Sequence, residues 1–477
     1  MIGAVRAHEA GALHAGAGQR GPSWLREPGD VNTLVAGLWS RNVERGGDGV
    51  LRAAGVSVTE LASEFGTPAY VIDEDDFRSR AREFLSAFGS AFAAIGPGAD
   101  VFYAGKAFLS VATARWIAAE GLGLDVCTGG ELAVAERAGF PMERVAMHGN
   151  NKSAAELGRA LDLGVGRIVV DSLHEVERLA SLAADRGARP RVLIRVTVGV
   201  EAHTHEYIAT AHEDQKFGFS LAGGAASDAV TAVLGEPSLE LLGLHSHIGS
   251  QIFDTSGFEI AAKRVVGLHA AVQAEHGIDL AELGLGGGYG IAYTTQDDPW
   301  PATELAAGMA EIVDHECRAY QVGVPRISVE PGRAIAGPAG FTLYEVGTVK
   351  PVEVDGGASR RYIAVDGGMS DNIRTALYDA DYSCTLASRS SDAPPLLSRV
   401  VGKHCESGDI VVKDEFLPAD VRPGDLLAVP GTGAYCRSMA STYNHLPRPP
   451  VIAVKDGAAR VIVRRETEDD LLRLDSE

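Results

Sequence analysis

Lys106 is the residue whose type and position most directly suggest chemistry. It follows an apolar run, residues 101–104, that is typical of a buried strand, and Gly105 separates it from that run. Most lysines lie where a compact, strongly hydrated charge stays in water. A lysine held at the end of a buried strand can lose part of its preference for the charged form, act as a nucleophile and form a Schiff base. Taken alone, Lys106 is explained more simply as a salt-bridged or snorkelling lysine, so its meaning depends on its neighbours.

Polar or glycine-rich segments end the other apolar runs in the same way. Individually they have ordinary explanations, because Asp125 and Asp171 could cap the following helices, His148 could be a loop histidine and Arg195 an ion-pair partner. Together they predict a set of functional groups at one rim of the fold. The endings are Lys106, Asp125, His148, Asp171, Arg195, His247, the glycines 286–288 and the segment 330–333.

Two of these endings predict a phosphate site. Gly286, Gly287 and Gly288 follow the seventh apolar run, and glycines allow several backbone N–H groups to crowd around one anion. Arg333 follows the eighth run and supplies a permanently charged fork suited to phosphate oxygens. Barrels often bind phosphate with the loops after strands seven and eight, which are the places where these residues lie.

A metal site is the competing interpretation of one motif. His245 and His247 are alternate residues of a predicted strand and would share a face, so both imidazoles could ligate one metal, as in barrel hydrolases. The motif continues into Gly249 and Ser250, where a glycine and a small hydroxyl suit a phosphate better. We therefore expect no metal.

A strand–helix rhythm from about residue 70 to 340 must position these groups. Eight βα units of this spacing predict a (β/α)8 barrel, an α/β fold whose active site lies at the carboxyl ends of the strands. A doubly wound sheet is the alternative, but it would gather polar residues at a single switch point. The predicted strands are 101–106, 123–126, 145–149, 167–171, 191–196, 241–249, 282–288 and 326–331, with helices that include 130–139, 154–163, 174–186 and 258–276.

The helical rhythm disappears after residue 340. Residues 341–354, 362–365, 399–403, 409–413, 425–429 and 451–463 read as strands between turns, with a loop at 385–396. The predicted organisation is a disordered extension (1–35), a segment that joins the β domain (36–73), a barrel (74–340) and a β-rich domain (341–477).

Composition excludes several classes of protein. The formal charge of -21, without a Lys/Arg stripe, argues against a nucleic-acid partner. The five cysteines are scattered and show no CxxC spacing, which fits reduced thiols in the cytoplasm. The first 40 residues hold no apolar block typical of a signal peptide, and no run is long enough to span a membrane.

Taken in order, the motifs resemble the fold-type III pyridoxal-phosphate decarboxylases, and within them the diaminopimelate decarboxylases. The resemblance extends from about Ser57 to Tyr443. It implies a barrel that binds pyridoxal phosphate, a β-rich C-terminal domain as in alanine racemase-like proteins, and the decarboxylation of meso-2,6-diaminopimelate to L-lysine, the last step of bacterial lysine biosynthesis. The motifs that carry it are residues 103–107, 245–250, 286–288, 330–333 and 405–409.

The resemblance also implies roles for barrel residues. Lys106 would form the Schiff base with the cofactor, His247 would stack on its ring, and Glu330 would pair with its ring nitrogen. A carboxylate there keeps the nitrogen protonated, which favours decarboxylation, whereas the racemase relatives carry an arginine. Ser250, Gly288 and Arg333 would hold the phosphate. We expect the cofactor site also to include Asp125, Gly286, Gly287 and Gly332.

Substrate-binding residues are implied in the second domain. Arg374 and Tyr378 lie four apart in a short helical turn, which we expect Asp371 to cap. They are either an exposed surface pair or, by the resemblance and together with Arg333, the binding site for the distal carboxylate of the substrate.

The remaining implied roles concern the motif 405–409 and the assembly. Cys405 would be the acid that reprotonates the substrate carbon, Glu406 would bind the distal ammonium, and Tyr435 would touch the cofactor phosphate and the substrate. Cys405 and Glu406 would reach the pocket of the partner chain, so a homodimer is implied.

Two alternatives remain for the function besides the metal-dependent barrel hydrolase considered above. One is a related decarboxylase of the ornithine, lysine or arginine type, whose substrate would have no use for Arg374. The other is an inactive relative with a binding or regulatory role, which could lose Lys106 or Cys405 without harm, yet both are present.

Overall fold

The computed structural model describes residues 21–199, 216–354 and 358–476. The chain forms two compact units, and each contains segments that are distant in sequence. Of the described residues, one unit comprises those within 78–291 and 299–335. The other comprises residues 21–77, 292–298, 336–354 and 358–476. The organisation predicted above, with boundaries at 35, 73 and 340, stays a proposal.

The first unit is a closed barrel of eight parallel strands, which confirms the predicted fold class. Neighbouring strands pair in sequence order, and two further pairings, β8 with β9 and β13 with β5, close the sheet on itself. Closure rules out the doubly wound alternative, because an open sheet keeps two unpaired edges. The barrel strands are β5 (Ala99–Ala104), β6 (Gly123–Val126), β7 (Val145–Met147), β8 (Arg167–Val170), β9 (Arg191–Thr197), β11 (Glu240–His245), β12 (Glu282–Gly286) and β13 (Arg326–Val329).

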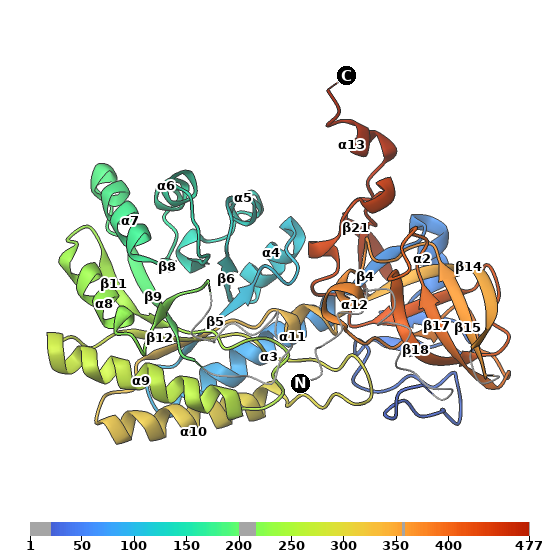
Figure 1. Cartoon of the computed structure of the whole chain (residues 1–477), viewed down its shortest axis with the longest axis horizontal. Helices are drawn as coiled ribbons and strands as arrows, with labels where there is room; N and C mark the ends of the chain where they lie inside the picture. The colour runs from blue at the N-terminus through green and yellow to red at the C-terminus, as the bar shows by residue number, and fades with distance from the viewer. Residues whose placement is uncertain (1–20, 200–215, 355–357, 477) are drawn as a thin grey trace, which may run out of the picture. The chain divides into compact units, whose positions relative to one another are not determined.

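Every residue of β6, β7, β8 and β12 is buried, as expected for parallel strands covered on both faces. Helices alternate with the strands and surround the barrel, with α9 and α10 packed side by side (Figure 1). These helices are α3 (Glu74–Ala93), α4 (Val111–Ala119), α5 (Gly129–Ala138), α6 (Ala154–Leu163), α7 (Leu173–Arg186), α8 (Ala225–Gly235), α9 (Ser256–His276) and α10 (Ala302–Tyr320); α11 (Arg333–Ala336), β10 (Phe219–Ser220) and the 3-10 helix Met142–Arg144 are shorter.

Hydroxyl side chains start the helices that follow the first strands. Ser110, Thr128, Ser153 and Ser172 each accept a hydrogen bond from a backbone N–H of the first turn of α4, α5, α6 and α7. The expectation that Asp125 and Asp171 cap helices is therefore wrong. The hydroxyl residues that follow them satisfy the helix ends, which leaves the carboxylates available at the barrel rim.

Six of the eight predicted barrel strands end earlier than expected, and two of these early ends change the position of a site residue. Strand β5 ends at Ala104 rather than 106, and β11 ends at His245 rather than 249. Lys106 and His247 thus lie in loops beyond the strand ends.

The second unit is rich in antiparallel strands and includes residues from before the barrel. Strand β4 lies in the middle of its large sheet, antiparallel to β14 and parallel to β20. The strands of this unit are β1 (Val43–Arg45), β2 (Leu51–Ala53), β3 (Val56–Ser57), β4 (Ala69–Asp73), β14 (Gly340–Val354), β15 (Ala358–Val365), β16 (Thr385–Leu386), β17 (Pro395–Val401), β18 (Ile410–Pro418), β19 (Leu426–Pro430), β20 (Val451–Lys455) and β21 (Ala458–Val463). Its helices are α2 (Val58–Phe65), α12 (Arg374–Tyr378), α13 (Glu468–Leu472) and the 3-10 turns Arg437–Met439 and Tyr443–His445.

One apolar core joins the early and late segments of this unit. Val71 of β4 packs with Leu51, Phe341, Leu343 and Ile452, all of them buried. The stretch 385–396, expected to be a loop, contains β16 and the start of β17. Its strands are short or begin with proline, so the sequence pattern hides them.

No helix in the described part of the chain is both long and apolar enough to cross a lipid bilayer. Most of the predicted N-terminal extension, residues 1–20, lies outside the described residues.

Candidate active site

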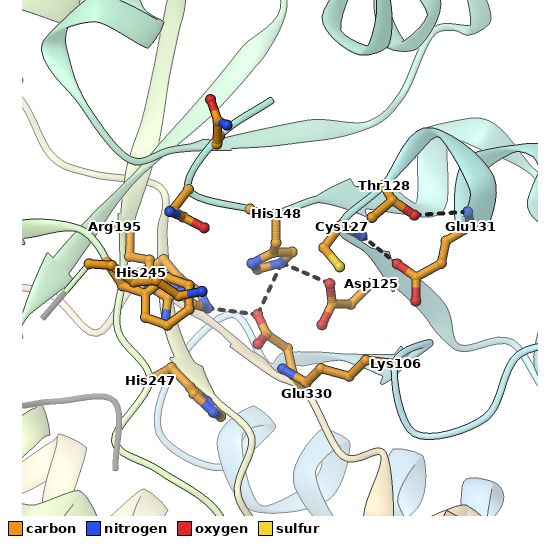
Figure 2. Close-up of a pocket in the computed structure, with 15 residues that line it drawn as sticks. Lys106, Asp125, Cys127, Thr128, Glu131, His148, Arg195, His245, His247 and Glu330 are labelled. Carbon is orange, nitrogen blue, oxygen red and sulfur yellow. Dashed lines mark hydrogen bonds and ion pairs between the residues drawn. The ribbon is translucent and has the colours of Figure 1, made fainter. Parts of the chain in front are cut away.

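A cavity of about 400 Å³ opens at the carboxyl ends of the barrel strands. Lys106, Asp125, His247 and Glu330 from the predicted set line it, together with His148 and Arg195, which also end predicted strands. In Figure 2 the amine end of Lys106 points toward Glu330. The structure thus brings together in one pocket residues that lie more than two hundred positions apart.

His245 and His148 hold the carboxylate of Glu330 at the centre of the pocket. Nε2 of His245 lies 2.8 Å from Glu330 Oε1, and Nε2 of His148 lies 3.4 Å from the same oxygen. Nε2 of His148 is also 3.6 Å from Asp125 Oδ1, so this imidazole stands between two carboxylates (Figure 2). The two imidazole rings meet edge to face, with their centroids 4.9 Å apart.

The two carboxylates differ in their affinity for protons. Burial raises the pKa of Asp125 well above its usual range, and the nearby charge of Glu330 raises it further. Burial also acts to raise the pKa of Glu330, but the neighbouring His245 and His148 more than offset this effect and hold the pKa well below its usual range. Burial lowers the pKa of His148 well below its usual range. The directions of these shifts favour a charge on Glu330 over one on Asp125, and the uncharged form of His148.

The three glycines at the end of β12 are required by close backbone approaches. A Cβ on Gly287 would lie 2.2 Å from the carbonyl oxygen of Glu330, and one on Gly288 would lie 2.6 Å from that of Gly249. Gly287 donates its N–H to Nδ1 of His247, at 3.1 Å, which orients this ring. Side chains here would fill the space in which backbone N–H groups can approach a ligand, and the cradle therefore fits an anion.

Two more predicted phosphate ligands meet beside this cradle. The guanidinium of Arg333 donates to the hydroxyl of Ser250, with 2.9 Å between Nη2 and Oγ. Gly332 packs closely on β5, since a Cβ there would lie 2.9 Å from Cβ of Ala104. An arginine, a serine hydroxyl and a glycine turn are chemically suited to a phosphate group.

The sequence interpretation did not identify several pocket residues. Arg195 lies over the ring of Phe217 at 4.3 Å, and Oδ1 of Asp171 accepts the N–H of Gly218 at 2.6 Å, so two rim residues hold a wall of the pocket. Some of these residues could have been predicted from the sequence, because the polar stretch after β7 and the turn after β6 both follow strand ends. The missed lining residues are Cys127, Thr128, Glu131, Gly149, Asn150, Asn151, Lys216 and Phe217, and His245 was considered only as a metal ligand.

The metal interpretation paired the wrong histidines. Among the described residues, the donors that could share an ion are His148, His245 and Glu330, and His247 is not one of them. Strand β11 ends at His245, so the alternation that would place His247 on the same face does not continue.

Arg374 of the second unit is buried between two tyrosines. Its guanidinium donates to the hydroxyl of Tyr382 and lies 4.7 Å from the ring centroid of Tyr293. Tyr378 lies four residues on in α12 and is half-buried. The interpretation of Arg374 as a surface residue is thus wrong, and so is that of Asp371 as a cap. Ile373 occupies the cap position, and the buried Asp371 binds Tyr344 and the N–H of Gly368.

The loop that carries Cys405 is held by hydrogen bonds to Asn444, which is exposed, and to Asp409, which is buried. Asn444 Oδ1 lies 3.1 Å from Nδ1 of His404 and accepts the N–H of Cys405 at 3.4 Å. Asp409 accepts the N–H of His404 at 2.8 Å. Cys405 and Glu406 themselves are exposed. Tyr435, the last predicted residue, is half-buried and has a φ of 58°.

The fold and the pocket together define the class of pyridoxal-dependent decarboxylases. The family described as "Pyridoxal-dependent decarboxylase, pyridoxal binding domain" matches residues 74–337. The diaminopimelate decarboxylase of Mycobacterium tuberculosis is 59% identical over 93% of this chain and 98% of its own length. The enzyme of Mycobacterium leprae is 55% identical over 99% of this chain and 100% of its own length. The enzyme of Bacillus subtilis is 48% identical over 90% of this chain and 95% of its own length. The chain belongs to the diaminopimelate decarboxylases, which confirms the resemblance stated from the motifs.

Solved structures agree with this assignment. The diaminopimelate decarboxylase of M. jannaschii in complex with L-lysine superposes with a TM-score of 0.83 at 30% identity, over 91% of this chain and 97% of that one. A lysine/ornithine decarboxylase from Vibrio vulnificus superposes with a TM-score of 0.67 at 24% identity and shares the fold.

Proposed function

We propose that this protein is a carboxy-lyase that converts meso-2,6-diaminopimelate to L-lysine and CO2 with pyridoxal phosphate as its cofactor. One observation carries the decarboxylase chemistry, namely the buried carboxylate of Glu330 held ionised beside Lys106 in the barrel cavity. The substrate assignment rests on the relatives named diaminopimelate decarboxylase, which match this chain along nearly their whole length. The activity is the final step of lysine biosynthesis, in a cytoplasmic setting consistent with five scattered cysteines that form no disulfide.

The pocket residues fit this cofactor. Lys106 would hold it covalently through its amine, and Glu330 would pair with its ring nitrogen. His247 would contact the ring face, and Asp125 would lie in the same binding site. The residues that would hold its phosphate are Ser250, Gly286, Gly287, Gly288, Gly332, Arg333 and Tyr435. When bound, pyridoxal phosphate supplies an electron sink for the carbanion that CO2 leaves behind.

The chain's own residues provide the electrostatic control of this chemistry. An ionised Glu330 favours a positive charge on the ring nitrogen and thereby strengthens the electron sink. The imidazole of His245 donates a hydrogen bond to Glu330, which stabilises the ionised carboxylate. The Gly287 N–H holds Nδ1 of His247, which limits rotation of the ring that would lie against the cofactor.

Recognition of the distal end of the substrate would require an anion site and a cation site. Arg374 is a buried cation bound by tyrosines, and among the residues described its guanidinium forms no carboxylate ion pair that would neutralise it. We assign it, with Tyr378, Arg333 and Tyr435, to the distal carboxylate. Glu406 would bind the distal ammonium. A substrate without the distal carboxylate would leave a buried arginine unmatched, which disfavours the ornithine and lysine alternatives.

Cys405 would deliver the proton to the substrate carbon after CO2 has left. Its exposure and that of Glu406 agree with a role at the surface where two subunits meet, and both residues would serve the pocket of the partner in a homodimer.

The test is CO2 release from meso-diaminopimelate, lysine and ornithine by the purified protein supplied with pyridoxal phosphate. We expect release from diaminopimelate and at least a hundredfold less from the other two. Release from ornithine or lysine at a higher rate than from diaminopimelate would overturn the substrate assignment. A protein that binds no pyridoxal phosphate would overturn the function as a whole.

A further inference from the structure

His148 is a buried pocket residue to which none of the roles above has been given. Its Nε2 atom lies within 3.6 Å of a carboxylate oxygen on each of two acidic residues, Asp125 and Glu330. Within the described part of the chain, this buried atom makes no hydrogen bond of good geometry. A polar atom that is buried and faces two acceptors is expected to have a function, because burial without a partner is costly.

The two carboxylates cannot both be ionised without a large electrostatic cost. Asp125 and Glu330 are buried side chains that line one cavity, and the charge of Glu330 raises the pKa of Asp125, whereas Lys106 and Arg195 act to lower it. Two such groups share a proton, and their protons are released in steps that belong to the pair. Which residue carries the proton depends on which carboxylate accepts more hydrogen bonds in its ionised form.

His245 gives Glu330 the first of these bonds. Its Nε2 must donate, since the oxygen at 2.8 Å is an acceptor when Glu330 is ionised. Its Nδ1 is buried and has no hydrogen-bond partner among the described residues. A proton on that atom would be buried without an acceptor, so the ring is best explained as the neutral Nε2–H tautomer.

A neutral His148 has one N–H to offer and two carboxylates in reach. When the N–H of His148 points at Glu330 Oε1, which is the closer oxygen, Glu330 has two imidazole donors, His148 and His245. Asp125 then has no donor from these histidines. The other ionisable groups that face this cluster include Lys106, Cys127, Glu131, Arg195, His247 and Tyr289.

We propose that His148 is a positioning residue that keeps the proton of the Asp125–Glu330 pair on Asp125 and leaves Glu330 ionised toward the ring nitrogen of the cofactor. This inference rests on the proposed function and extends it, because it names the residue that sets the protonation state of the carboxylate. His148 acts through Glu330 and need not touch the substrate.

The first experiment compares His148→Phe with His148→Asn, since the phenyl ring removes the donor and the amide retains one. Loss of an N–H donor that faces a charged carboxylate raises the pH at which the acid limb of kcat/KM appears by about one unit or more. We expect this shift in His148→Phe, a smaller one in His148→Asn, and a parallel shift in the pH at which the absorbance of bound pyridoxal phosphate changes. Profiles of His148→Phe that superpose on the wild type would overturn the proposal.

His269→Asn is the matched control. His269 is a buried histidine of α9 that does not line the cavity, and its replacement is expected to leave both pH profiles unchanged. Equal shifts in the control and in His148→Phe would mean that the effect is structural, and would overturn the specific role of His148.

A second experiment needs neither a variant nor turnover. In the cofactor-free protein labelled with 15N-histidine, His148 is expected to give the nitrogen shifts of a neutral ring protonated on Nε2 at pH 7, with His148→Asn used to assign the signal. A doubly protonated His148 would overturn the inference even if the enzyme is active. A wild type that releases no CO2, while His148 is neutral and protonated on Nε2, would instead overturn the proposed function.

Discussion

Nε2 of His245 lies 2.8 Å from Oε1 of Glu330, although the two residues are separated by 85 positions in the sequence. His245 ends strand β11, and Glu330 follows β13. Strand β12 lies between them in the barrel, and its glycines let the two side chains meet above it. The hydrogen bond from His245 stabilises the ionised form of this buried carboxylate.

Replacement of Lys106 by alanine is expected to remove the covalent bond to the cofactor. The visible absorbance of the bound cofactor should disappear and CO2 release should fall by at least a thousandfold, while the circular dichroism spectrum stays the same. Lys263→Ala, at an exposed position of α9, is the control and should behave like the wild type. A coloured and active Lys106→Ala protein would contradict the assignment.

Glu330→Gln keeps the shape of the side chain and removes its charge. We expect the cofactor still to bind and turnover to fall about a hundredfold, because the ring nitrogen loses its anionic partner. Its pH–rate profile should also lose the part of the acid limb that belongs to the Asp125–Glu330 pair. Steady-state kinetics between pH 5 and 9 provide the measurement, and unchanged turnover would show that the charge is unnecessary.

Cys405→Ala is expected to leave cofactor binding intact and to lower turnover by a hundredfold or more, the usual range for loss of a general acid. Asn444→Ala should lower it by a smaller factor, because the loop loses the acceptor shared by His404 and the backbone of Cys405. The rate of proton incorporation into the lysine product separates this step from CO2 release. Equal rates in the wild type and Cys405→Ala would exclude Cys405 as the acid.

Arg374→Lys keeps the positive charge and removes the planar fork that binds Tyr382. We expect KM for diaminopimelate to rise about tenfold to a hundredfold, since a charge-assisted hydrogen bond is lost. Residual activity toward ornithine, which has no distal carboxylate, should change little. An equal effect on both substrates would place Arg374 in structural support instead.

Asp371 predicts a pH dependence of stability. Burial raises its pKa to about 7, and the nearby Asp409 adds to this effect. The folded state thus retains a proton that the unfolded chain releases above pH ~4. The free energy of unfolding therefore falls as the pH rises from ~4 to ~7, and Asp371 causes no further fall above pH ~7. The change is about 4 kcal/mol, at 1.36 kcal/mol for each pH unit.

Asp371→Asn should abolish that loss, because the amide keeps the contacts with Tyr344 and Gly368 without titrating. Thermal unfolding of the two proteins between pH 4 and 8 provides the measurement. The free energy of unfolding of Asp371→Asn, relative to that of the wild type, should increase as the pH rises. A constant difference would show that Asp371 does not carry a shifted proton in the folded state.

The chain's local patterns were sufficient for much of this description. Eight apolar runs with polar endings predicted the barrel and its rim, and the motifs around Lys106, Glu330 and Cys405 predicted the family. Local patterns failed where a neighbour took over a role. Thr128 and Ser172 cap the helices for which Asp125 and Asp171 were the alternative caps. Asp371 binds Tyr344 rather than a helix end.

The sequence by itself determined which residues can do chemistry and which strand ends carry them, because period, turn residues and side-chain type are local properties. Only the tertiary structure decided that His148 and His245 converge on Glu330, and that Tyr293 and Tyr382 enclose Arg374. Those pairings depend on the closure of the barrel and on the packing of strands far apart along the chain. Neither the closure of the barrel nor this packing can be inferred from the spacing of residues within one strand.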